Sequence, residues 1–253
     1  MSKIKIVSIV FLLFIFSLGI GFTGLNSNSI QADELKNKQV KLAEEIIKSI
    51  KFQKEIQNEL ETIKNKQQGN PDDLNIDLTL EKTFQKTLEN LQIQLLKDKM
   101  EFQLVNQQLL SVGQTAALPY LGDGSYVWPV DGYFNVSQGY SGRHKGVDIN
   151  TLGAHPSVFA VQTGIVTKAM DEGDGFGNKV VIYHGENKYT LYAHLDTIKA
   201  KVGQYIDEGT VLGTVGNTGN SDGDHLHIQL TFSGDVENNT INPWDYIKSA
   251  EKK

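Results

Sequence analysis

The hydrophobic pattern of this 253-residue chain changes three times along its length. Residues 6–25 form an uncharged, largely apolar run behind Lys3 and Lys5. This pattern is typical of a secretion signal or an N-terminal membrane anchor, and it predicts export. Two alternatives remain open: cleavage after residues 30–32, or retention of a segment long enough to span a bilayer. We assign residues 1–32 to this segment.

Residues 33–111 show apolar positions on alternating three- and four-residue steps. The residues on these steps are Leu35, Leu42, Ile46, Ile56, Leu60 and Ile63, and then Phe84, Leu88, Leu91, Leu95, Phe102, Val105 and Leu109. This spacing indicates two amphipathic helices, and the turn residues 69–72 separate them. We therefore predict an antiparallel coiled-coil hairpin with polar interruptions at Gln39 and Asp98. The hairpin is either a spacer or partner-docking arm, or a coil that self-associates.

Residues 112–125 lose this periodicity and gain Gly, Ala and Pro, which indicates a linker. From residue 126 the period falls to two, in short runs rich in Val, Ile and aromatic residues between Gly, Asp and Asn turns. The predicted strands include residues 127–130, 133–136, 157–160, 164–167, 179–183 and 189–192. We expect an all-β antiparallel domain over residues 126–253.

Composition narrows the possible partners and metal ligands. The whole chain has a net charge of −6, and residues 112–253 carry 10 basic and 16 acidic side chains. This balance argues against nucleic acid, which requires clustered cations. The chain has no cysteine, so a metal would be held by His, Asp, Glu or water.

Four histidines and one aspartate of the β domain carry the candidate chemistry. His225 and His227 lie two residues apart and would share one strand face. His144 and Asp148 lie four apart, and an extended segment would return both to one face. Two nitrogens and one carboxylate oxygen, with a fourth position for water, are typical of a catalytic zinc site.

These motifs, with Leu191-Tyr192-Ala193-His194-Leu195 and the glycine run 213–219, resemble the lysostaphin-type (LytM-type) zinc metallopeptidases of bacterial peptidoglycan. The resemblance extends over about residues 128–246. It implies an antiparallel β fold with a substrate groove, and His144, Asp148 and His227 as ligands of one Zn²⁺. It also implies that His194 and His225 flank the metal-activated water, and that the substrate is a peptide of the wall, in a stem peptide or a cross-bridge.

The alternative function is a non-catalytic wall-binding module that activates or supports other wall hydrolases. Such degenerate members would lack one or more of the five residues, all of which are present here. Residues 202–213 also look like a carrier-domain hairpin repeat, which the metal constellation disfavours.

Several further residues receive expectations. Tyr140 is either an additional oxyanion donor or a packed aromatic residue, and His155 and His184 are assigned to structure. We expect Asp222 and Asp224 to lie at the groove edge and to favour a cationic part of the substrate. We expect membrane contact only through the N-terminal segment, and localisation outside the cytoplasmic membrane.

Overall fold

The computed structural model describes residues 28–67, 74–132, 135–233 and 238–247. Most of the predicted signal or anchor segment lies outside these residues. Asn28 already begins helix α2, so the last five residues of that segment are helical. Within the described part of the chain, no helix combines the length and the apolar character needed to cross a membrane.

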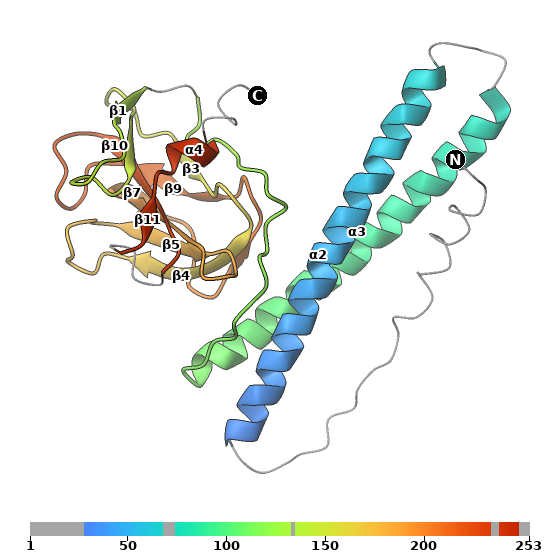
Figure 1. The fold of residues 1–253 in the computed structure, drawn as a ribbon, viewed down its shortest axis with the longest axis horizontal. Coiled ribbons are helices and arrows are strands. Elements are labelled where there is room, and N and C mark those ends of the chain that lie inside the picture. Colours follow the sequence, from blue (N-terminus) through green and yellow to red (C-terminus); the bar gives the residue numbers. More distant parts are fainter. Residues whose placement is uncertain (1–27, 68–73, 133–134, 234–237, 248–253) are drawn as a thin grey trace. The chain divides into compact units, whose positions relative to one another are not determined.

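Helices α2 (Asn28–Gln67) and α3 (Leu74–Ser111) lie side by side as the predicted hairpin (Figure 1). They are antiparallel, because Lys38 near the start of α2 pairs with Glu101 near the end of α3 at 2.7 Å. The predicted apolar positions form the seam between them, and buried members include Leu42, Ile46, Ile56, Leu60, Leu91, Leu95, Phe102 and Leu109. The two predicted helices are thus confirmed, whereas the turn predicted at residues 69–72 lies outside the described residues.

The polar interruptions of the seam are buried and hydrogen-bonded. Gln39 is 1% exposed and donates a hydrogen bond from Nε2 to Oδ1 of Asn106 at 2.8 Å. Asp98 is also buried and accepts a hydrogen bond from Gln94 at 2.8 Å. A buried polar pair between helices stabilises only the register in which both partners meet, so Gln39 and Asn106 favour one alignment of the helices. The Gln94–Asp98 hydrogen bond lies within α3.

The described residues between 136 and 241 form antiparallel β structure, as predicted. One sheet has the order β1-β2-β10-β6-β5-β4-β8, with β11 paired to β10, and the other has the order β3-β9-β7. The strands are β1 (Val136–Gln138), β2 (Val147–Asn150), β3 (Ser157–Phe159), β4 (Gly164–Met170), β5 (Lys179–Tyr183), β6 (Tyr189–Ala193), β7 (Leu195–Ile198), β8 (Tyr205–Ile206), β9 (Val211–Val215), β10 (His225–Thr231) and β11 (Thr240–Ile241). A short helix, α4 (Trp244–Ile247), follows β11.

The main core lies between the two sheets. Alternate residues of the larger sheet, such as Val147 and Ile149 of β2 and Leu226 and Ile228 of β10, point into this core. The smaller sheet covers them with residues including Leu212 of β9. Because strand side chains alternate between faces, the residues between these apolar positions point to the opposite face, where the site lies.

The strand predicted over residues 127–130 is absent. The segment makes one isolated bridge, between Val130 and Val158, and its hydrogen bonds with the 157–161 segment are irregular. Pro129 explains this difference, because proline has no N–H to donate to a ladder.

The hairpin and the predicted linker both contact the β domain. Nε2 of Gln103 and Nδ2 of Asn106 donate hydrogen bonds to the carbonyl of Gly203, at 2.5 and 2.8 Å. Leu118 of the linker is buried, and the backbone N–H of Leu121 donates to the carbonyl of His184 at 2.7 Å. Residues 112–125 therefore connect the hairpin to the β domain, and part of this segment packs against the β domain.

Candidate metal centre

Strand register places Asp148 and His227 opposite each other. Strands β2 and β10 are antiparallel neighbours in which His227 pairs with Asp148 and His225 pairs with Asn150. On its other side β10 pairs with β6, with His227 opposite Ala193. Directly opposed residues of adjacent strands project from the same face, so the carboxylate and the imidazole meet without help from a loop.

His144 reaches the same point from a bend that precedes β2. The segment from His144 to Asp148 is not one continuous strand, because β2 begins only at Val147. The bend passes close to β10, and a Cβ atom at Gly146 would lie 2.7 Å from Nε2 of His227. Glycine at this position lets the chain turn against the His227 ring. The predicted convergence of His144 with Asp148 nevertheless occurs.

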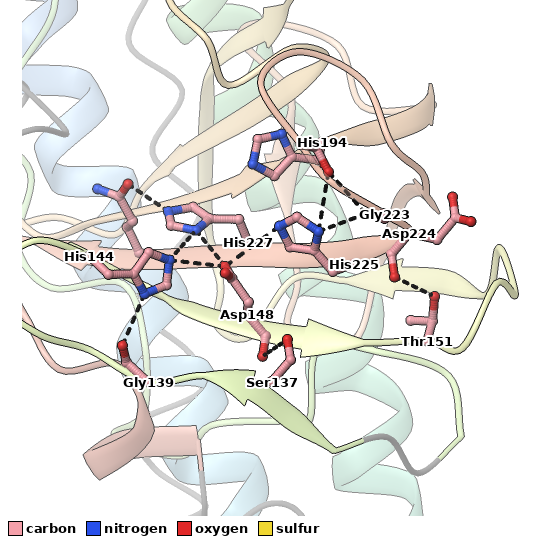
Figure 2. A network of polar contacts seen from close by, with 12 residues as sticks. Ser137, Gly139, His144, Asp148, Thr151, His194, Gly223, Asp224, His225 and His227 are labelled. Atoms are coloured by element: carbon pink, nitrogen blue, oxygen red, sulfur yellow. Dashed lines mark hydrogen bonds and ion pairs between the residues drawn. The ribbon is translucent and has the colours of Figure 1, made fainter.

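Three potential ligand atoms converge in this region (Figure 2). Nε2 of His144 lies 3.1 Å from Oδ1 of Asp148 and 3.1 Å from Nδ1 of His227. Nδ1 of His227 lies 2.7 Å from the same carboxylate oxygen. Among the described residues this is the only group of three or more such side chains whose ligand atoms lie within 4.8 Å of one another.

Hydrogen bonds at the far side of each ring determine which nitrogen carries a lone pair. Nδ1–H of His144 donates to the carbonyl of Gly139 at 3.0 Å, and Nε2–H of His227 donates to Oε1 of Gln229 at 2.8 Å. The converging nitrogens are then the unprotonated ones in the neutral rings. Two lone pairs and a carboxylate therefore face one another, and a cation is required to make this arrangement favourable.

The donor set fits zinc. Burial raises the pKa of Asp148, but the neighbouring His227, His144 and His225 outweigh burial and hold that pKa below its ordinary value. The carboxylate is therefore ionised at neutral pH and available as a ligand. Two neutral imidazoles and one carboxylate are a donor set that zinc accepts, and each imidazole has the second hydrogen bond typical of metal-bound histidine.

His225 lies beside this group with its Nε2 turned toward Asp148 (Figure 2). Nε2 is 3.7 Å from Oδ1 of Asp148, while Nδ1–H donates to the carbonyl of Gly223 at 2.8 Å. Its ring is 4.8 Å from that of His194 between centroids. The structure thus brings His194 and His225 together next to the three converging ligands.

His194 occupies an unusual backbone position between β6 and β7. Its φ angle is +60°, a left-handed conformation that non-glycine residues adopt rarely. Its backbone N–H donates to the carbonyl of Phe176 at 2.9 Å, and its Nδ1–H donates to the carbonyl of Thr218 at 2.8 Å. Burial lowers the pKa of His194 to about 4, so the ring is neutral at pH 7 with a free lone pair on Nε2.

The five residues open onto a groove of about 510 Å³. Its lining residues all fall between Ser137 and His227, so neither the helical hairpin nor the linker contributes to it. Among the described residues, its lining contains no lysine or arginine and includes four histidines and four aspartates: His144, His194, His225, His227, Asp148, Asp174, Asp222 and Asp224. The groove therefore has a negative net charge when its histidines are neutral and unliganded. Its net charge lies closer to zero when they bind protons or a metal cation.

The two carboxylates expected at the groove edge differ in their surroundings. Oδ1 of Asp224 lies 3.3 Å from Nε2 of His155, and Nδ1 of the same ring lies 3.7 Å from Oδ2 of Asp196. Asp222 is exposed and has no ion-pair or hydrogen-bond partner among the described residues. Asp222 is therefore the freer of the two carboxylates.

The remaining sequence candidates have structural partners. The hydroxyl of Tyr140 donates to the carbonyl of Thr240 at 2.8 Å, and its ring packs against the main core. It behaves as a packed aromatic residue, one of the two alternatives. His184 is fully buried, its Nδ1–H donates to the carbonyl of Thr163 at 2.8 Å, and its Nε2 lies 2.8 Å from the hydroxyl of Thr190.

Sequence reasoning missed Gln229 and Phe176. Gln229 follows His227 by two residues on β10 and so shares its face, which was a usable signal in the alternation pattern. Phe176 places its ring 5.8 Å from that of His227 across the groove. The loop that carries Phe176 has no periodicity that would indicate this contact.

Comparison with known families agrees with this geometry. Residues 142–243, which include the three converging ligands and both flanking histidines, match the sequence model of Peptidase family M23. The β domain is therefore a peptidase M23 domain.

Relatives of this M23 domain have different roles. It is 34% identical over 118 residues to the peptidoglycan DD-endopeptidase ShyA of Vibrio cholerae, covering 42% of this chain and 27% of ShyA. It is 31% identical over 121 residues to the murein hydrolase activator NlpD of Escherichia coli, covering 47% of this chain and 30% of NlpD. The chain thus spans less than a third of either relative.

A solved structure also resembles the M23 domain. The catalytic domain of the antimicrobial peptidase lysostaphin from Staphylococcus simulans is 27% identical. The alignment covers 46% of this chain and 92% of that domain, with a TM-score of 0.42.

Proposed function

We propose that the M23 domain is a zinc-dependent endopeptidase that hydrolyses peptide bonds of bacterial peptidoglycan, in a stem peptide or a cross-bridge. One observation carries this proposal. Nε2 of His144, Nδ1 of His227 and Oδ1 of Asp148 converge within 3.1 Å of one another, at the base of an open groove. Two further imidazoles lie next to them, and a binding module would need neither.

His144, Asp148 and His227 would hold one Zn²⁺ in this site. Bound zinc lowers the pKa of a coordinated water and polarises the scissile carbonyl. Three protein ligands leave a position for that water, which distinguishes a catalytic from a structural zinc site. Gly139 and Gln229 hold the two rings in the tautomers that zinc binding requires.

His225 and His194 would handle the protons of the reaction. In both rings Nδ1–H donates to a backbone carbonyl, so Nε2 is the atom that can accept a proton. One Nε2 can take the proton of the attacking water, and the other ring, once protonated, can donate to the oxyanion or the leaving amine.

The acidic groove supports a substrate that carries positive charge. The lining has no lysine or arginine, and Asp222 has no cationic partner among the described residues. A wall peptide with a free amine close to the scissile bond would provide that partner. This extends the expectation that the two groove-edge carboxylates favour a cationic part of the substrate. It assigns most of that recognition to Asp222.

The alternative proposal is a non-catalytic module that activates or supports other wall hydrolases. The similarity to the activator NlpD favours it. The presence of all five candidate residues in one constellation favours the enzyme instead.

The N-terminal part of the chain leads to two further proposals. The apolar run of residues 6–25 supports export, with the M23 domain in the wall or at the outer face of the cytoplasmic membrane. The helical hairpin would bind a protein partner or a second copy of the chain.

The deciding experiment combines zinc analysis with wall digestion by the full chain. We expect about one zinc per chain, and release of soluble muropeptides from purified sacculi by the wild type but not by His225→Ala. Stoichiometric zinc without wall cleavage would overturn the enzyme proposal and favour the activator. In that case the full chain should raise muropeptide release by an added wall hydrolase.

A further inference from the structure

Lys179 is a buried cation that the proposed reaction does not use. It is the first residue of β5, and its side chain is completely buried. Nζ lies 2.6 Å from Oε2 of Glu172 and also binds Oδ2 of Asp174. The same Nζ lies 5.6 Å from the centre of the Phe176 ring. All three partners belong to the loop of residues 171–178, which connects β4 to β5.

This loop lies against the candidate catalytic centre. Its residues Asp174 and Phe176 line the groove, and the Phe176 ring lies 5.8 Å from that of His227. The carbonyl of Phe176 accepts the backbone N–H of His194 at 2.9 Å, and the carbonyl of Gly175 accepts the backbone N–H of Asn220 at 2.8 Å. The loop therefore makes one of the two hydrogen bonds that orient His194.

The second hydrogen bond comes from the turn at Thr218, and the loop is in direct contact with this turn. A Cβ atom at Gly177 would lie 2.5 Å from the Thr218 carbonyl carbon, so the two backbones are in direct contact. The backbone N–H of Asn178 donates to Oγ1 of Thr218 at 3.0 Å. The carbonyl of Thr218 in turn accepts Nδ1–H of His194 at 2.8 Å. Both hydrogen bonds that orient His194 thus depend on where the loop lies.

The loop sequence would not hold this shape by itself. Gly173, Gly175 and Gly177 all have positive φ angles, and glycine loses more conformational freedom on ordering than other residues. Glu172 and Asp174 would also repel each other without a cation between them. A buried ammonium group with two carboxylate partners supplies attraction that is screened less by water than a surface ion pair.

We infer that Lys179 is a positioning residue: its buried ammonium group fastens the 171–178 loop, which holds His194 in its left-handed conformation and covers His227. The effect on turnover rests on the proposed peptidase function. The effect on the geometry of His194 does not, because that geometry exists in the free protein.

The test compares Lys179→Met with Lys168→Met. Lys168 binds the same Oε2 of Glu172 at 2.8 Å, but its side chain is 39% exposed and does not line the groove, which makes it a matched control. We expect Lys179→Met to lower kcat roughly 10- to 100-fold, with KM and zinc content within about twofold, because a small displacement of a catalytic group is costly. Lys168→Met should stay within about twofold of the wild type in all three.

Amide hydrogen exchange provides the readout that needs no activity. The backbone N–H of His194 should exchange about tenfold faster or more in Lys179→Met, while those of Tyr192 and Leu226 in the core keep wild-type rates. Lys179→Arg retains the charge and should recover part of the protection. Uniform acceleration at all three amides would mean general destabilisation and would overturn the positioning role.

Asp174→Asn keeps the proposal testable if Lys179→Met does not fold. Asp174 is partly exposed, and the change removes one of the two carboxylate partners of Lys179. It should raise His194 amide exchange in the same direction, by less. Wild-type exchange at His194 in every folded variant would refute the inference. A wild type that cleaves no wall substrate would refute the proposed function alone.

Discussion

His225 and His227 lie on one face of β10 but turn opposite ring nitrogens toward Asp148. Nε2 of His225 lies 3.7 Å from Oδ1 of Asp148, and Nδ1 of His227 lies 2.7 Å from the same atom. The difference follows from the second hydrogen bond of each ring, which engages Nδ1 of His225 and Nε2 of His227. Two residues with the same side chain on the same strand face therefore have different chemical roles available to them.

We predict that substitutions of these two histidines separate metal binding from turnover. His227→Ala should lose zinc and muropeptide release together, because it removes one of three converging ligands. His225→Ala should retain most of its zinc and lose about 10²- to 10⁴-fold in turnover, the usual contribution of a proton-transfer group. Zinc analysis of the purified proteins and wall digestion measure both effects, and equal zinc loss in the two variants would contradict the division of roles.

Gln229 should control the affinity of the site for zinc. Replacing it with leucine removes the acceptor for Nε2–H of His227, so the ring is free to adopt the other tautomer and to rotate. We expect Gln229→Leu to bind zinc roughly 10- to 100-fold more weakly in a titration against a competing chelator. Gln229→Glu keeps an acceptor at this position and is the control; equal affinities for wild type and Gln229→Leu would exclude the role.

The groove carboxylates should discriminate between substrates with and without a free amine. Asp222→Asn should reduce kcat/KM on an amine-containing wall peptide about tenfold, and leave an amine-blocked peptide nearly unchanged. Asp224→Asn should have a smaller effect, because His155 already lies 3.3 Å from its carboxylate. Equal losses on both peptides would show that the carboxylates do not recognise the amine.

His184 should make the fold sensitive to acid. Burial lowers its pKa from 6.5 to about 4 in the folded protein, so the unfolded chain binds a proton more readily between these values. The stability that depends on neutral His184 is complete above about pH 6.5 and is lost as the pH falls toward 4. The shift corresponds to about 3 kcal/mol.

Urea unfolding of the wild type and His184→Gln measures this contribution. The difference in the free energy of unfolding between the two proteins should fall by about that amount between pH 7.5 and pH 4, since contributions they share cancel. A constant difference across this range would show that His184 does not titrate on unfolding.

Several features of the fold could be predicted from local pattern. The three- and four-residue spacing located both helices, and the period of two located strands such as β5 and β6, because burial on one face depends only on local periodicity. The segment at Pro129 was mispredicted, since apolar content alone does not show that a proline interrupts a hydrogen-bond ladder.

The sequence by itself determined which residue types could form the site. Without cysteine, the donors had to be histidine and carboxylate, and the two-residue spacing of His225 and His227 placed them on one strand face. Tertiary structure alone decided how these residues meet, because their meeting depends on strand register and on contacts between distant segments. The pairing of β2 with β10 brings Asp148 to His227, and Nε2 of His144 comes within 3.1 Å of Nδ1 of His227. Such contacts join residues up to about 80 positions apart, and a hydrogen bond at that separation leaves no local pattern in the sequence.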